Sequence, residues 1–328
     1  MELNELLFLF DHHSGVLRLR EQLSARRPRV RLEGLRGSSA AVVLGAAAQT
    51  SSDFFLVVGD DEEEAAYFYN DLRQLLGEHT VLFLPSSYRR AVKYGHRDTA
   101  GEILRTDVLS RLSGRAAGAE AGEALFVVTF PAALAERVAP RVSLSARSLS
   151  LKVAESHDVI ELTHRLEELG FRRKDYVYEP GEYALRGSIL DIFSYASEYP
   201  YRIDFFGDEV ESVHSFEVQT QLSRSAVEGA QIVPNVEGDA SSEQLVPITD
   251  YFPQQPVVVA HDLQFVCDRV QQIFDEGFAD QALAEQAATS EMELSEVYAR
   301  FAASRLLVNG KELQSQLVRG MYWQWSKA

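Results

Sequence analysis

The chain has 328 residues, 46% hydrophobic and 25% charged, so it is globular and long enough for two or three domains of about 100–200 residues each. Acidic residues outnumber basic ones by 49 to 32, which gives a net charge of −17 at pH 7. A free-standing protein that grips nucleic acid through its phosphates is expected to carry the opposite sign.

The single cysteine, Cys267, excludes an internal disulfide framework and a cysteine-rich zinc site. The first residues, Met1–Glu5, lack the basic stretch that opens a signal peptide, and no apolar run approaches the roughly 18 residues of a membrane span. We therefore expect a cytoplasmic protein with no membrane partner.

The first third of the chain alternates predicted strands with predicted helices. An apolar strand at 53–58 precedes a helix over 60–76, which ends at Gly77. Further strands are expected at 80–84 and 124–129, with an exposed loop over 113–122 between them. Such alternation is typical of an open, parallel α/β sheet.

The middle third has a different pattern, in which one helix precedes a series of strands. Ser156 is a candidate N-cap for a helix that ends at Gly170. The strands expected after it are 176–179, 183–193, 201–206 and 210–218, with a tight turn at Gly207-Asp208. Strands without crossover helices form antiparallel sheets, so we expect a small α+β domain.

The last third returns to α/β signals. A strand is expected at 256–260, helices over 262–274 and 278–300, and another strand at 306–308. If this section completes the first sheet, the middle domain is an insertion. The predicted division is 1–143 and 223–328 for the two parts of the α/β domain, and 144–222 for the inserted domain. The ending at 323–328, without a tail, favours a longer parent protein.

Nucleotide hydrolysis is the first activity to test in an α/β chain. A phosphate-binding loop needs glycines, then a lysine for the phosphates and a hydroxyl for magnesium. The nearest candidate contains Gly34 and Gly37, but Ala40 and Ala41 occupy the places of the lysine and the hydroxyl. An ordinary turn before a helix explains this loop better.

Other catalytic signals are missing from the sequence. The strand at 257–259 is followed by Ala260-His261-Asp262, which lacks the paired carboxylates of an ATPase. Cys267 lies on a predicted amphipathic helix, where a buried small side chain is more common than a nucleophile. We expect no catalytic residues, no metal site and no cofactor.

A binding surface has better support in the middle domain. Alternation along 201–206 places Arg202, Asp204 and Phe206 on the face opposite Tyr201, Ile203 and Phe205. Arginines are common anchors at protein interfaces because their planar guanidinium pairs bidentately with carboxylates, and further arginines lie at 172, 173 and 186. On spacing alone, a solvated face with local ion pairs explains these residues slightly better.

Two segments of the middle domain resemble a known family. They are Pro180-Gly181-Glu182-Tyr183-Ala184-Leu185-Arg186-Gly187-Ser188-Ile189-Leu190-Asp191-Ile192-Phe193 and Glu198-Tyr199-Pro200-Tyr201-Arg202-Ile203-Asp204-Phe205-Phe206-Gly207-Asp208-Glu209-Val210-Glu211-Ser212. The pattern is similar to that of the transcription-repair coupling factors, in the UvrA-binding domain that they share with the excision-repair protein UvrB. The resemblance is strong over about residues 150–225 and weaker on either side.

The resemblance implies a non-catalytic module that recruits UvrA at stalled RNA polymerase in nucleotide excision repair. The implied UvrA contacts are Arg172, Arg186, Arg202 and Asp204, with Arg173 and Phe193 as neighbours. The flanking halves are implied to form a helicase-like α/β domain whose ATP site, with Ala40 and Ala41, is degenerate.

In the full-length family protein, ATP-driven translocation on double-stranded DNA and RNA polymerase binding belong to domains absent from this chain. The alternative is a UvrB-type, ATP-dependent DNA-handling subunit with an unrecognised nucleotide loop.

Overall fold

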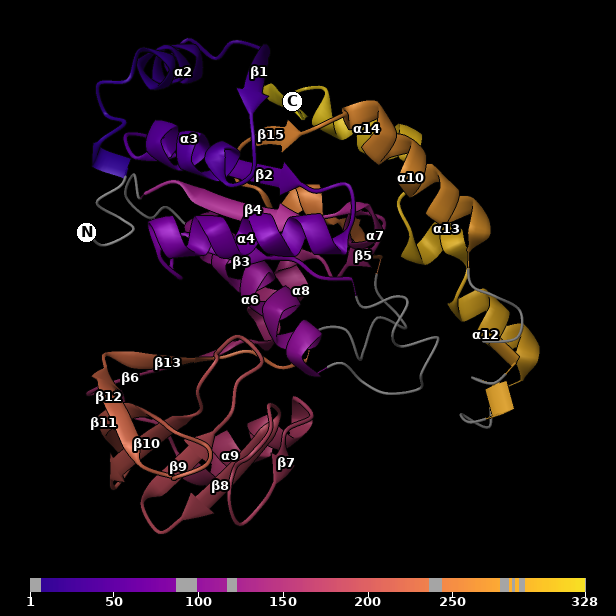
Figure 1. Ribbon diagram of the computed structural model, residues 1–328. Helices are drawn as coiled ribbons and strands as arrows, with labels where there is room; N and C mark the ends of the chain where they lie inside the picture. The colour runs from indigo at the N-terminus through magenta and orange to yellow at the C-terminus, as the bar shows by residue number, and fades with distance from the viewer. Residues whose placement is uncertain are drawn as a thin grey trace. The chain divides into compact units, whose positions relative to one another are not determined.

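The computed structural model describes residues 7–86, 99–116, 123–235, 244–277, 283–284, 287–288 and 293–327. The chain divides into two compact units (Figure 1). Unit 1 contains 1–98, 111–138 and 244–328, and unit 2 contains 99–110 and 139–243, so the division falls within helix α6 (Thr99–Ala116). Among the described residues, no helix combines the length and apolar character needed to cross a membrane.

Unit 1 is built on a six-stranded sheet in which all neighbouring strands are parallel. Its strand order is β1-β16-β15-β2-β4-β3. The strands are β1 (Arg29–Leu35), β2 (Phe54–Val58), β3 (Val81–Phe83), β4 (Leu125–Thr129), β15 (Val257–Ala260) and β16 (Tyr322–Lys327). Every residue of β2, β4 and β15 is buried, as expected for parallel strands covered on both faces.

Unit 1 also contains eight described helices besides the part of α6 assigned to it. They are α2 (Ser14–Ser24), α3 (Ser39–Ala48), α4 (Glu62–Leu76), α7 (Pro131–Leu134), α10 (Leu263–Glu276), α12 (Leu294–Arg300), α13 (Ala303–Leu306) and α14 (Gly310–Leu317). Helix α3 contacts α4, whereas α10 contacts α7 and α14. Because parallel crossovers are right-handed, α3 and α4 lie on one face of the sheet and α10 and α14 on the other.

The strand order confirms that the middle of the chain is an insertion. Strands β15 and β16 come from the last third, yet β15 pairs with β2 and β16 with β1. Where the chain leaves and re-enters unit 1, β5 (Arg137–Val138) pairs with β14 (Val246–Pro247), which precedes a 3-10 turn, η1 (Ile248–Tyr251). Unit 2 extends beyond the predicted 144–222, and those boundaries stay a prediction.

Unit 2 contains a second six-stranded sheet with the order β12-β11-β10-β9-β8-β7. Its strands are β7 (Arg172–Arg173), β8 (Glu182–Arg186), β9 (Ile189–Ile192), β10 (Tyr201–Phe206), β11 (Glu209–Phe216) and β12 (Ser223–Val227). All pairs are antiparallel except β7 with β8. Helix α8 (Arg141–Arg147) leads into a small ladder of β6 (Leu149–Lys152) with β13 (Gly229–Ile232).

The core of this α+β unit lies between the sheet and one helix, α9 (Val159–Glu168). Leu162 and Leu166 pack with buried side chains of the sheet. These sheet residues are Tyr183, Leu190, Ile192, Ile203, Phe205, Val210 and Val213. The predicted α+β insertion is therefore confirmed, including the hairpin turn at Gly207-Asp208, where φ of Gly207 is +63°.

Several local predictions in unit 2 are wrong. Asp158, not Ser156, caps α9 by accepting hydrogen bonds from two backbone amides. The strand predicted over 183–193 is a hairpin, because Gly187 at φ +62° turns the chain back on itself. The stretch 176–179 lies outside the strands, since β8 starts at Glu182.

Unit 1 also differs locally from the expectations. Residues 113–116 belong to α6 instead of a loop, and 117–122 lie outside the described residues. The strand predicted at 306–308 is wrong, because α13 reaches Leu306 and only Leu307 forms a bridge, to Glu136. About half of the helix predicted over 278–300 falls on residues that the structure leaves undescribed, and α12 covers its end.

The contact between α10 and α14 depends on Gly310. A Cβ atom there would lie 2.4 Å from the carbonyl oxygen of Cys267 on α10, so we expect Gly310→Ala to reduce the free energy of unfolding by about 1–3 kcal/mol. Urea denaturation measures this loss. In the control, Gly114→Ala, the new Cβ meets no atom within 4 Å, and unchanged or raised stability is expected. Equal stability losses in both variants would contradict this account.

Candidate functional site

The predicted arginine face of unit 2 is organised by a buried carboxylate. Asp191 lies on β9 between β8 and β10 and is completely buried. Its register partner on β10 is Arg202, so their side chains project from the same face of the sheet. This is the face opposite α9, because the intervening residues Leu190 and Ile192 belong to the core.

Both arginines of the centre bind this carboxylate. Arg202 binds it bidentately, with Nε 2.8 Å from Oδ1 and Nη2 2.9 Å from Oδ2. Arg186 donates from Nη2 to Oδ2 of the same group. Hydrogen bonding to Asp191 raises the pKa of the Arg202 guanidinium, so it stays charged. Asp191 thus pairs with two cations, and Asp204 supplies a further negative charge that acts on Arg202.

Further contacts fix the positions of the two guanidinium groups. Arg202 lies 4.5 Å from the ring centroid of Phe216 and donates from Nη1 to the carbonyl oxygen of Gln221, at 3.0 Å. Arg186 lies 5.0 Å from the ring centroid of Tyr176 and donates from Nη1 to the carbonyl oxygen of Asp175, at 2.7 Å. The side chains of Arg186 and Arg202 remain 35% and 17% exposed. Arg186 is therefore the more accessible of two preorganised donors.

Two more predicted residues lie on the same face. Arg172 is the register partner of Glu182 on β8, and its side chain is 61% exposed, with Nη2 3.7 Å from carboxylate oxygens of Glu179 and Glu182. Asp204 follows Arg202 by two residues on β10, so alternation places it beside that arginine. The structure thus places Arg172, Arg186, Arg202 and Asp204 on one face of the sheet.

The other two predicted contacts are placed differently. Arg173 is the register partner of Tyr183, which faces the core, so Arg173 lies at the edge of the opposite face. Phe193 is only 5% exposed and packs with Val177, Ala184 and Phe216. Phe193 therefore belongs to a small buried cluster with Ala184, the register partner of Asp191. Arg173 is separated from the other arginines.

Sequence reasoning missed the residue that organises the centre. Asp191 lies within the segment that resembles the family, and a carboxylate between the apolar residues Leu190 and Ile192 in a strand is itself a signal. A buried charge must be paired, and the arginines were the available partners. Tyr176 and Gln221 gave no comparable signal, because their contacts depend on loops that fold across the sheet.

The glycine-containing loop of unit 1 forms the turn between β1 and α3. Gly34 and Gly37 adopt positive φ values, +78° and +52°, and Ala40 and Ala41 are buried in the first turn of α3. The loop is therefore a turn before a helix, and its interpretation as a degenerate nucleotide loop stays a prediction. Cys267 is buried on α10, where burial raises the pKa of its thiol to about 11, as expected of a packing residue.

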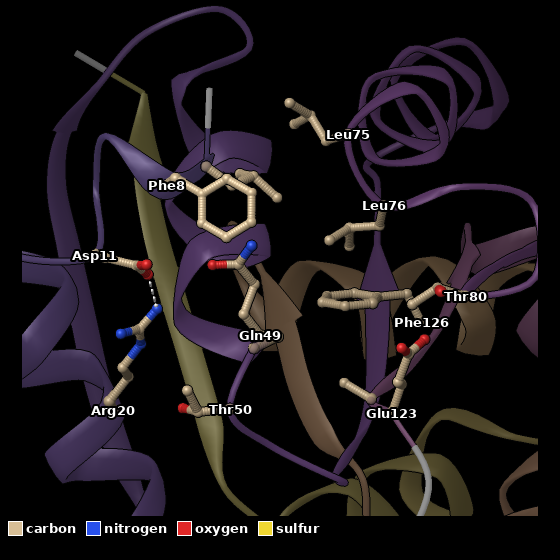
Figure 2. Close-up of a pocket in the computed structure, with 13 residues that line it drawn as sticks. Phe8, Asp11, Arg20, Gln49, Thr50, Leu75, Leu76, Thr80, Glu123 and Phe126 are labelled. Carbon is tan, nitrogen blue, oxygen red and sulfur yellow. Dashed lines mark hydrogen bonds and ion pairs between the residues drawn. The ribbon is translucent and has the colours of Figure 1, made fainter. Parts of the chain in front are cut away.

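A cavity of about 510 Å³ lies at the opposite edge of this sheet (Figure 2). Its lining includes Gln49, Thr80 and Ala124, which precede β2, β3 and β4. Parallel sheets generally bind ligands at the carboxyl ends of their strands, which is the other edge. Arg20 in the lining pairs with Asp11 at 2.7 Å and also donates to the carbonyl oxygen of Ala46. The candidate functional site is therefore the face in unit 2.

Comparison with known proteins supports this choice. Residues 149–237, which include every strand of the arginine face, match the family described as the UvrB interaction domain. The chain is also 40% identical to the transcription-repair-coupling factor of Escherichia coli (strain K12) over 101 residues, 31% of this chain and 9% of the relative. Over these stretches the chain is similar to the transcription-repair coupling factors. This confirms the resemblance seen in the sequence.

Two further transcription-repair coupling factors show similar relationships. That of Bacillus subtilis (strain 168) is 34% identical over 167 residues, 50% of this chain and 13% of the relative. That of Haemophilus influenzae (strain ATCC 51907 / DSM 11121 / KW20 / Rd) is 32% identical over 127 residues, 39% of this chain and 11% of the relative. The matches thus span about a tenth of the length of these curated relatives.

The buried carboxylate gives a direct test of this arrangement. Asp191→Asn leaves both guanidinium groups without their anion, and charge-assisted hydrogen bonds contribute about 1.5–3 kcal/mol each. Because the arginines keep partial access to water, we expect the free energy of unfolding to fall by about 2 kcal/mol. Chemical denaturation of unit 2 measures the change.

Asp204→Asn is the matched control. Its carboxylate is half-buried, and among the described residues it accepts just one hydrogen bond, a long one of 3.4 Å from the hydroxyl of Ser212. A change within about 0.5 kcal/mol is expected. If the two substitutions have the same effect, Asp191 does not organise the face.

Proposed function

We propose that this chain is a recruitment module of a transcription-repair coupling factor, whose arginine face in unit 2 binds UvrA. The supporting observation is the centre of that face, where Asp191 holds Arg186 and Arg202 in fixed positions within the segment that matches the UvrB interaction domain. Fixed arginines lose little side-chain entropy on binding, so they suit recognition of carboxylates on a partner.

The proposed contact set follows from exposure and strand register. Arg172, Arg186, Arg202 and Asp204 make the contacts, and Phe193 supports them through Phe216. Exposed aromatic residues border these positions, with Tyr176 51% exposed and Phe206, next to the hairpin turn, 80% exposed. Aromatic and arginine side chains together are typical of interface hot spots.

In this proposal the module acts in the cytoplasm in transcription-coupled nucleotide excision repair. RNA polymerase binding and ATP-driven movement on double-stranded DNA belong to other parts of the full-length protein. The chain itself works without catalysis, because Ala40 and Ala41 offer a nucleotide neither an ammonium group nor a hydroxyl.

Binding to UvrA of the same organism tests the face. Loss of a central interfacial arginine commonly costs about 2 kcal/mol or more, so Arg186→Ala is expected to weaken binding roughly 30-fold in a calorimetric titration without DNA. Arg173→Ala, on the other side of the sheet, is the matched control and is expected to bind as the parent does. Equal affinity of parent and Arg186→Ala for UvrA would refute the assignment.

A thermal melt tests the absence of nucleotide binding. A ligand at 100 times its Kd stabilises a folded protein by about 2.7 kcal/mol, which raises the melting temperature measurably. We expect no shift with millimolar ATP and magnesium. A saturable increase in melting temperature would instead favour a UvrB-type, ATP-dependent subunit.

A further inference from the structure

Three potential metal ligands meet at the carboxyl edge of the sheet in unit 1. Asp60 follows β2, Glu64 lies in the first turn of α4, and His261 follows β15. Strands β2 and β15 are parallel neighbours, with Val58 opposite Ala260, so the residues after them emerge at the same edge. One ligand atom from each of the three side chains lies within 4.8 Å of the other two. No other three groups in the described parts of the chain lie so close.

The turn before α4 brings the two carboxylates together. Gly59 allows the chain to fold tightly there, because a Cβ atom at that position would lie 2.7 Å from the backbone nitrogen of Ala65. Oε2 of Glu64 accepts a hydrogen bond from the backbone nitrogen of Asp60, at 2.7 Å. Oε1, the other oxygen of Glu64, is directed toward His261, with Nε2 at 3.1 Å.

The imidazole of His261 is oriented as a ligand would be. Its Nδ1 lies 2.8 Å from the carbonyl oxygen of Trp325, which can only accept, so Nδ1 carries a proton. In the neutral ring this leaves Nε2 with a lone pair. Histidines that bind metals typically donate their second nitrogen to a carbonyl or carboxylate in this way, which fixes the tautomer.

This tautomer places two acceptors against each other. The lone pair of Nε2 lies 3.1 Å from a carboxylate oxygen, although the indole Nε1 of Trp325 also donates to Nε2, at 2.5 Å. A proton on Nε2 would donate to Glu64 but would oppose the indole N–H. An ion pair between a protonated His261 and Glu64 would need one carboxylate only. The carboxylate of Asp60 lies at the same point, and a metal ion can bind all three groups.

We propose that Asp60, Glu64 and His261 form a binding site for a divalent transition metal such as zinc or manganese. One imidazole with two carboxylates suits these ions better than magnesium or calcium, which prefer oxygen ligands alone. The side chains of His261 and Glu64 are 11% and 24% exposed, so the site is partly shielded but open to ions. Asp61, Glu62 and Glu63 add negative charge in the same turn. This site lies in unit 1. It uses none of the residues proposed to contact UvrA and none of the loop that contains Gly34 and Gly37.

Trp325 provides a reporter for the site. A metal on Nε2 takes the lone pair to which the indole donates, so the indole must release its hydrogen bond to His261. The chain contains only two tryptophans, and the other, Trp323, is completely buried in the sheet. Metal binding is therefore expected to change tryptophan emission in the parent and in Trp323→Phe, but not in Trp325→Phe.

The experiment titrates the whole chain with zinc chloride and, separately, with manganese chloride, by calorimetry and tryptophan emission. We expect saturable binding of one ion, weakened at least about tenfold in His261→Ala, as for loss of a residue that holds a metal site. Asp60→Asn changes little shape and tests the site again if His261→Ala fails to fold. His157→Ala is the matched control, since His157 lies 3.4 Å from Glu155 in a simple pair and should leave binding unchanged.

Three results would overturn the proposal. They are no saturable binding of either metal to the parent, equal affinity of the parent and the folded site variants, and saturable binding without a change in tryptophan emission. The last result would place the ion elsewhere on the acidic surface.

Discussion

Two parallel strand pairings determine the organisation of the whole chain. β15 lies beside β2 and β16 beside β1, although about 200 or more residues separate the partners along the sequence. The sheet of unit 1 is complete only when both ends of the chain are in place. The middle segment must then build a core of its own, and it does so with α9 on one face of an antiparallel sheet. The ladder between β5 and β14 holds the outgoing and returning chain together at the boundary of unit 1.

The face of that second sheet opposite α9 contains the buried carboxylate of Asp191. A buried charge is compatible with a stable fold only when it is paired and hydrogen-bonded. Asp191 meets this condition through two arginines from the strands on either side. The pairing also affects the arginines, because an unpaired arginine side chain loses much conformational freedom when it binds a partner. Here most of that loss has already occurred on folding. The same interaction therefore contributes to the stability of unit 2 and, in the proposed function, prepares its surface for recognition of UvrA.

The sequence predicted the parallel sheet, the insertion and the α+β unit, since each depends on hydrophobic period and element order. It predicted β10 with its boundaries, because alternation from Tyr201 to Phe206 is unambiguous. It failed where one residue decides the local path. Gly187 divides an apparently continuous apolar strand into β8 and β9, and Asp158 caps α9 in place of Ser156. β16, rich in aromatic residues, was not predicted at all, because its place in the sheet depends on partners far away in the chain.

The candidate site shows the same limit. Strand alternation places Arg202 and Asp204 on one face, but it cannot show that Arg186 crosses to the carboxylate of Asp191 or that Arg173 turns to the other side. The first depends on the hairpin at Gly187, and the second on the pairing of a two-residue edge strand. Placing these side chains therefore required the register of three strands as well as the identity of each residue.

The carboxyl ends of the parallel strands in unit 1 are occupied by side chains that contact one another. Where a nucleotide loop would present a lysine and a hydroxyl, Ala40 and Ala41 are buried in α3. At the neighbouring strand ends, His261 contacts Trp325, whose indole stacks on Phe68 with the ring centroids 5.3 Å apart. These rings link α4, β15 and β16 through packing and hydrogen bonds of their own. The side chains at these strand ends thus hold α4, β15 and β16 together through contacts within the protein itself.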